Sequence, residues 1–158
     1  MRNSLRLLVL GVIVVATSSL PVTAGPSDVA PVPSAARGPA IPQDKGYLVQ
    51  EIRGGLYWIT DGTYQVMFLT TGRGVIAVDA PPNLAQKYLK AIADVTSERV
   101  THVIYSHAHG DHIGAADIFP KGVKIIAHQE TADLLRRAKD PKRPVPTVTF
   151  TKTYTLRV

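Results

Sequence analysis

Three of the five histidines in this chain lie in one short segment, residues 106–114, with the sequence SHAHGDHIG. The segment places His107, His109, Asp111 and His112 within six positions of one another. Neutral imidazoles and a carboxylate are ligands that zinc and other borderline divalent metals favour. The chain contains no cysteine, so any metal must be held by nitrogen and oxygen atoms. The segment therefore predicts a binding site for Zn²⁺ or another divalent ion.

A buried strand and a glycine turn are expected to position these four side chains. Residues 100–105 form a nearly continuous apolar run, which is typical of a strand covered on both faces. His107 and His109 follow it two positions apart, so strand alternation would aim both imidazoles to the same side. Gly110 and Gly114 allow a sharp turn that would bring the aspartate and the last histidine to the same cavity. A solvated histidine-rich loop and a chance cluster are the alternatives, and the buried strand and the glycines favour metal binding over both.

Hydrophobic patterning predicts the remaining elements. The predicted strands, the first three of them antiparallel neighbours, are 56–59, 64–69, 75–79, 100–105, 123–127, 148–150 and 154–158. Apolar residues at helical spacing predict amphipathic helices at 83–95 and 129–138, and a short helical stretch at 115–119. Leu134 and Leu135 are expected on the inward face of the second helix. Strands followed by alternating helices and strands favour a layered α/β (α+β) domain.

The first 46 residues are not expected to belong to this domain. Arg2 and Arg6 precede an apolar run at 7–16, and small residues lead to Ala24, which is the organisation of a secretory signal peptide. The run is shorter than the roughly 20 apolar residues of a membrane span, so no stable membrane insertion is expected after cleavage. Proline and small residues follow, which is typical of a flexible linker. The predicted segments are a signal peptide at 1–24, a linker at 25–46 and a folded domain at 47–158.

The leader predicts a periplasmic or secreted protein, and its basic charge does not point to a nucleic-acid partner. The formal net charge is +6, and part of it lies in the leader. The other concentration of positive charge begins in the last turn of the second helix and continues beyond it, at Arg136, Arg137, Lys139, Lys142 and Arg143. No aromatic side chains are interleaved with these cations, so we interpret them as a solvated helix end. The expected partner is a small-molecule substrate.

Three polar residues near the motif are not expected to take part in the chemistry. Ser106 and His107 are neighbours on an extended chain and face opposite ways, which is unsuitable for a serine nucleophile. His102 lies inside the predicted buried strand and is expected to pack in the core. His128 stands at a strand-to-helix junction, so we do not expect it to be a metal ligand.

The segment 106–114 resembles the H-x-H-x-D-H signature of the metallo-β-lactamase superfamily at all four ligand positions. The strand meander, a strand ending in Asp79, a helix and a buried strand that delivers the motif are also similar to that family. The resemblance covers about residues 48–158. It implies a metallo-β-lactamase-like αββα sandwich, of which this chain would supply the N-terminal αβ half, apparently truncated at its C-terminus.

The resemblance also implies roles for individual residues. His107 and His109 would bind one zinc, and Asp111 and His112 a second. A metal-bound hydroxide would attack an ester, an amide (β-lactam) or a similar bond, with Asp111 in the catalytic set. Asp79 would orient the loop, although it could equally cap the turn before Pro81.

The later metal ligands of the family have no counterpart in this sequence. A hydrolytic zinc usually takes three protein ligands and water, and each predicted ion has two. The sequence therefore leaves open whether one ion or two ions bind. It also leaves open an alternative function, in which the chain is a truncated or degenerate zinc-binding remnant without catalysis. A sheet with helices on one face only is also expected to associate with another chain or layer through its uncovered face.

Overall fold

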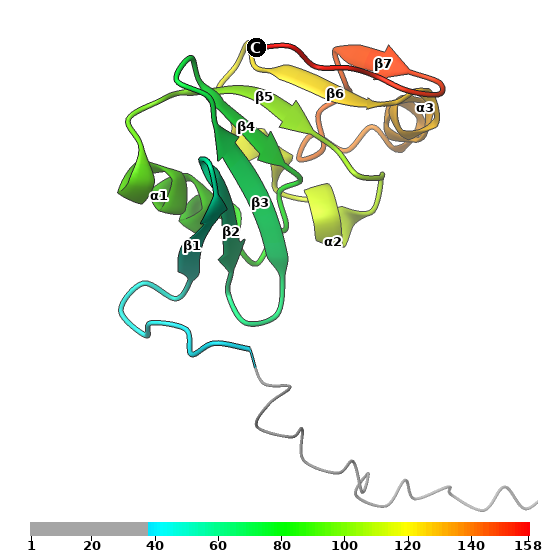
Figure 1. The fold of residues 1–158 in the computed structure, drawn as a ribbon. Coiled ribbons are helices and arrows are strands. Elements are labelled where there is room, and N and C mark those ends of the chain that lie inside the picture. Colours follow the sequence, from blue (N-terminus) through cyan, green and yellow to red (C-terminus); the bar gives the residue numbers. More distant parts are fainter. Residues whose placement is uncertain (1–37) are drawn as a thin grey trace, which may run out of the picture. The chain divides into compact units, whose positions relative to one another are not determined.

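The computed structural model describes residues 38–158, and a seven-stranded sheet is its central element (Figure 1). The strands are β1 Leu48–Arg53, β2 Leu56–Thr60, β3 Gln65–Thr70, β4 Val75–Val78, β5 Val100–Ile104, β6 Lys124–His128 and β7 Val148–Phe150. They lie in sequence order across the sheet. Neighbours from β1 to β4 pair antiparallel, and neighbours from β4 to β7 pair parallel. The predicted antiparallel start and the later βα alternation are both confirmed.

Helices occupy the connections between the parallel strands. They are α1 Ala85–Val95, α2 Gly110–Ile113, the 3₁₀ helix η2 Ala116–Ile118 and α3 Gln129–Ala138. Parallel pairing requires a crossover, and a helix returns the chain to the starting edge of the sheet. The core forms where the apolar sides of α1 and α3 meet one sheet face. Phe68, Val103, Tyr88 and Leu135 are each at most 1% exposed there.

Tyr88 joins α1 to the sheet through a fully buried hydroxyl. The hydroxyl donates to the Met67 carbonyl oxygen at 2.7 Å and accepts from the Val78 amide at 3.1 Å. Burial raises the pKa of Tyr88 far above its usual value, so the hydroxyl keeps its proton. The helix is thereby fixed at the end of β4, directly before Asp79.

The opposite sheet face also carries apolar residues. Trp58 pairs with Met67, and Val78, Ile104 and Ile126 are aligned across β4 to β6. Met67 is 45% exposed. The association of this face with another chain or layer stays a prediction.

Several local predictions are wrong. Residues 154–158 are not a strand: β7 ends at Phe150, and the Tyr154 ring stacks on the Phe150 ring at 6.0 Å. β propensity supplies no strand where no partner pairs with it. Leu134 is 48% exposed although its neighbour Leu135 is buried, because successive helical residues point about 100° apart.

Two further differences lie at the start of the domain. β1 was not among the predicted strands, because this edge strand is largely exposed and lacks an apolar pattern. Lys45, which belongs to the predicted linker, pairs with Asp94 of α1 at 2.7 Å. The predicted signal peptide and most of the linker lie outside the described residues. Among residues 38–158, no helix is both long and apolar enough to cross a membrane.

Candidate metal centre

The histidine motif begins just after β5 and continues into α2 (Figure 1). His109 is the N-cap of α2 and has an extended backbone, with φ −70° and ψ 143°. Its carbonyl oxygen accepts from the amides of His112 at 3.2 Å and Ile113 at 3.1 Å. Asp111 and His112 therefore lie in the first turn of this short helix. The centre is at the carboxyl end of a parallel strand, where open α/β sheets commonly bind ligands.

The structure brings the four predicted side chains together. The imidazole centroid of His107 lies 4.7 Å from that of His109 and 4.2 Å from that of His112. Asp111 Oδ2 lies 3.8 Å from His112 Nε2. The side chains of Asp111 and His112 are 53% and 41% exposed, so the cluster is open to solvent.

The prediction that strand alternation aligns His107 and His109 is wrong. β5 ends at Ile104, so His107 and His109 lie on a loop and strand alternation does not align them. The loop and the first turn of α2 bring the rings together instead. The predicted turn is made by α2, which begins at Gly110 and has Gly114 as its C-cap residue. Only Gly114 needs to be glycine, because a Cβ atom there would clash with the Gly110 carbonyl oxygen, whereas a Cβ atom at Gly110 would meet no neighbour.

Asp79 binds the motif loop from the end of β4. Its carboxylate accepts from the Ser106 amide at 2.7 Å and from the Ser106 hydroxyl at 2.6 Å. The same carboxylate lies 3.3 Å from His112 Nδ1. Asp79 is only 5% exposed and has a φ of 54°, a conformation that aspartate tolerates better than most residues. Of the two roles left open for Asp79, these contacts favour orientation of the loop.

Ser106 connects Asp79 to His107. Its hydroxyl oxygen lies 2.9 Å from His107 Nδ1 and donates its single proton to Asp79. The hydroxyl stands between the carboxylate and the imidazole, whereas in a serine hydrolase the imidazole stands between the other two. Ser106 is thus a bridge rather than a nucleophile, as the sequence predicted, but the predicted reason is wrong: the side chains of Ser106 and His107 do not face opposite ways.

The donor set suits a divalent cation in chemical type. Three imidazoles and one carboxylate are present, and the Nδ1 atoms of His107 and His112 face oxygen atoms. Within residues 38–158, no group of three or more histidine, aspartate or glutamate side chains is arranged as a ready-made metal site. The half-exposed side chains would have to rotate to converge on one ion.

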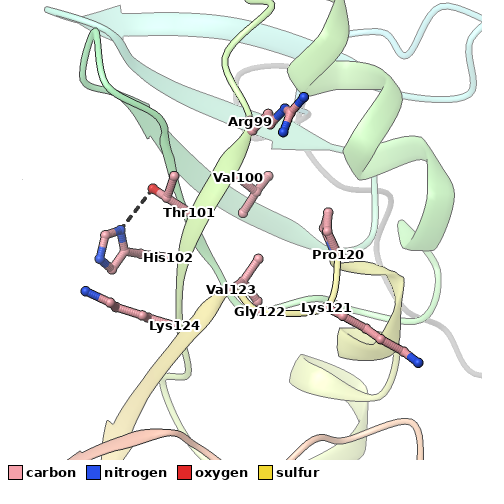
Figure 2. Close-up of a pocket in the computed structure, with 9 residues that line it drawn as sticks. All are labelled: Arg99, Val100, Thr101, His102, Pro120, Lys121, Gly122, Val123 and Lys124. Atoms are coloured by element: carbon pink, nitrogen blue, oxygen red, sulfur yellow. Dashed lines mark hydrogen bonds between the residues drawn. The ribbon is translucent and has the colours of Figure 1, made fainter.

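The other two histidines lie apart from this cluster. His128 Nδ1 accepts from the Glu130 amide and caps α3, while its Nε2 lies 2.9 Å from the Thr151 carbonyl oxygen. His102 is half-buried and lines a pocket of about 500 Å³ at the starting ends of β5 and β6, so it is not a core residue. Figure 2 shows its ring beside Lys124 and a dashed line from the ring to Thr101. His102 Nδ1 lies 2.9 Å from Thr101 Oγ1. Burial and Lys124 lower the pKa of His102.

Arg143 contacts the motif although its sequence context indicated a solvated helix end. Its Nη1 donates to the Ala108 carbonyl oxygen at 2.8 Å, and its Nε donates to Asp140 at 2.7 Å. The side chain is 20% exposed. A cation beside prolines in a basic run carries no sequence signal for such a contact. The Lys142 amide and the Arg143 guanidinium both hold the pKa of Asp140 below its usual value.

The family model of the metallo-beta-lactamase superfamily matches residues 59–150. The chain belongs to the metallo-β-lactamase superfamily. Among solved structures, this superfamily member is similar to metallo-beta-lactamase IND-7, at 22% identity and a TM-score of 0.58, over 71% of this chain and 56% of that one. A metallo-beta-lactamase from Pontibacter korlensis gives 20% identity and a TM-score of 0.57 over the same shares. The predicted family and fold are confirmed.

A curated relative that is not named as a β-lactamase has a higher sequence identity to this chain than the two solved structures. The 2,4-dinitroanisole O-demethylase subunit alpha of Nocardioides sp. (strain JS1661) is 36% identical over 100 residues. The match covers 60% of this superfamily member and 30% of the relative. The chain thus spans about half the length of the two solved structures and less of this relative.

Proposed function

We propose that this superfamily member is a metal-dependent hydrolase centred on His107, His109, Asp111 and His112. The observation that carries the proposal is the gathering of three imidazoles and a carboxylate, with Asp79 and Ser106 behind two of the rings. Histidines that bind a metal through one ring nitrogen typically donate the N–H of the other ring nitrogen to an oxygen atom. The matching family model supports the same reaction class.

The proposed ligand assignment is the one that the resemblance of residues 106–114 to the superfamily motif implies. His107 and His109 would hold one Zn²⁺, and Asp111 and His112 a second ion where one binds. Bound Zn²⁺ supplies Lewis-acid chemistry, which activates water and polarises the scissile carbonyl or phosphoryl group. The proposed substrates are small molecules with an ester, an amide (β-lactam) or a similar bond, and the open cluster supports their access.

The hydrogen bonds assign a tautomer to two histidines. The Ser106 hydroxyl donates to Asp79 at 2.6 Å, so it accepts the proton on His107 Nδ1. Asp79 likewise accepts from His112 Nδ1. Each ring then presents the lone pair of Nε2, the form in which a neutral imidazole binds a metal.

Asp111 is the proposed proton acceptor. It stands in the first turn of α2 with its carboxylate 53% exposed, where water can reach it. A carboxylate so placed can orient the attacking water and take up its proton. Asp111→Asn should therefore lower the rate of hydrolysis more strongly than it lowers substrate binding.

A second candidate function is the cleavage of a methyl aryl ether. The likeness to the 2,4-dinitroanisole O-demethylase subunit alpha favours it. Export to the periplasm or the medium also remains part of the proposal and rests on the leader sequence.

The test combines metal analysis with a substrate panel on the full chain. The panel holds a β-lactam, a lactone, a phosphoester and 2,4-dinitroanisole, with His107→Ala/His109→Ala as the test variant and His102→Gln as the matched control. We expect zinc in the parent and the control and none in the double variant, and any hydrolysis should follow the zinc content. Zinc binding without turnover would support the non-catalytic alternative, and equal zinc in the double variant would refute the site.

A further inference from the structure

We propose that Arg143 is a positioning residue for the histidine motif. The proposal rests on the metal-binding function above and concerns how the motif loop is held in place. Arg143 belongs to the loop between α3 and β7, residues 139–147, which we call the 139–147 loop. It acts through the backbone of Ala108, between the first two histidines of the motif.

The contact with Ala108 fixes the peptide that precedes His109. Arg143 Nη1 donates to the Ala108 carbonyl oxygen at 2.8 Å. Because a peptide unit is planar, the orientation of this carbonyl also sets that of the His109 amide. The carbonyl of His109 in turn accepts from the amides of His112 and Ile113. One guanidinium thereby holds the point at which the loop becomes α2.

Two anchors then lie on either side of His107. Asp79 holds the Ser106 amide at 2.7 Å, and Arg143 holds the Ala108 carbonyl at 2.8 Å. A loop fixed at both neighbours of a ligand loses less conformational entropy when a metal binds. The first anchor follows β4 in the chain, and the second follows α3.

The 139–147 loop is itself attached to the domain, so Arg143 is not a mobile surface side chain. Asp140 accepts from Arg143 Nε at 2.7 Å and from the Lys142 amide at 3.0 Å. The Lys142 carbonyl accepts from the Asp117 amide at 3.2 Å. The Tyr105 hydroxyl donates to the Pro144 carbonyl at 3.1 Å. The loop is thus bound to the end of β5 and to η2.

The contacts require arginine rather than any cation. Nε and Nη1 of one planar group reach two acceptors, Asp140 and Ala108, and a lysine ammonium cannot reproduce this fork. Asp140 also offsets the positive charge of Arg143 near a centre proposed to bind a cation. Arg136 offers the matched comparison, because it pairs with Asp133 at 2.6 Å in a half-exposed ion pair on α3.

The experiment compares Arg143→Ala and Arg143→Lys with the control Arg136→Ala in the full chain. The first readout is the Zn²⁺ dissociation constant, measured by competition with a chromophoric chelator. We expect Arg143→Ala to raise it about tenfold or more, which is the lower range for residues that support metal ligands. Arg143→Lys should raise it less, and Arg136→Ala should leave it unchanged.

The second readout needs no metal and separates this proposal from the proposed function. Amide hydrogen exchange in the metal-free protein should speed up at His112 and Ile113 in Arg143→Ala, and stay unchanged at Phe68 in the sheet. If the parent binds no Zn²⁺, the proposed function fails, and the exchange rates alone then test whether Arg143 positions the motif loop. Equal dissociation constants for Arg143→Ala and Arg136→Ala, or unchanged exchange where no metal binds, would overturn the proposal. If Arg143→Ala does not fold, the same comparisons are made with Arg143→Lys.

Discussion

Replacement of Asp79 tests the hydrogen-bond network behind the motif most directly. Asp79→Ala removes the acceptor of the Ser106 amide and of the Ser106 hydroxyl, at 2.7 and 2.6 Å. Hydrogen bonds to a charged group contribute about 1.5–3 kcal/mol each. Ser106 is exposed enough for water to replace part of the loss, so the lower figure applies to each bond. The φ of 54° at this position adds about 1 kcal/mol of strain for alanine. The free energy of unfolding should therefore fall by about 4 kcal/mol.

Asp79→Asn keeps much of what alanine loses. Asparagine tolerates the left-handed backbone, and its amide oxygen can still accept from the Ser106 amide. The lost charge weakens that bond, and the free energy of unfolding should fall by about 1–2 kcal/mol. The gap between the two variants, about 2–3 kcal/mol, reports the acceptor and the backbone strain together.

Urea denaturation of the metal-free protein measures both variants, and Zn²⁺ titration follows. Because Asp79 also faces His112 Nδ1, both variants should weaken Zn²⁺ binding about 10- to 100-fold. Asp61→Ala is the control, since Asp61 accepts from the Thr63 and Tyr64 amides in the β2–β3 turn. It should lower stability without changing Zn²⁺ affinity. A loss below about 1 kcal/mol for Asp79→Ala, or equal losses for alanine and asparagine, would refute the reasoning.

Three further outcomes are expected. Tyr88→Phe leaves the Met67 carbonyl and the Val78 amide without their buried partner and should lower the free energy of unfolding by about 2–3 kcal/mol in urea. Since the pKa of His102 is lowered by burial and by Lys124, the unfolded chain takes up this proton first as pH falls below 6.5. As the pH falls from 6.5 toward the lower pKa of His102 in the folded protein, the free energy of unfolding therefore decreases. His102→Gln should make this decrease smaller between pH 7 and 5, as measured by thermal unfolding. In an exporting host, intact-mass measurement should show a chain that starts near Gly25, and retention of Met1 would contradict the leader.

Elements with strong apolar patterns could be predicted from the sequence. The apolar run at 100–105 predicted a strand, and β5 is one, but it is not covered on both faces: Val103 is buried and its other residues are half-buried. Tyr88 and Ile92 showed the helical period of α1. The motif itself was visible because its three histidines and its aspartate lie close together in the chain. Propensity alone failed where tertiary pairing decides, as at residues 154–158.

The contacts that support the motif could be predicted only in part. Asp79 was a candidate through its place at a strand end, and its partner Ser106 lies 27 positions away. Arg143 was out of reach, because its contact with Ala108 depends on the path of a proline-rich loop 35 positions away. Sequence periodicity describes faces of strands and helices, and it carries no information on which backbone carbonyl a loop side chain will meet.

The strand order has a consequence for the assembly of the centre during synthesis. Each strand of the sheet pairs with its immediate predecessor, so the sheet can grow strand by strand as the chain emerges. The pairing of β5 with β4 brings Asp79 to Ser106 at an early stage. Arg143 reaches Ala108 only once the chain beyond α3 has been made. A nascent chain that ends before the 139–147 loop would contain every histidine of the motif, next to strands that are already paired. The Ala108 carbonyl would still lack its hydrogen bond from Arg143.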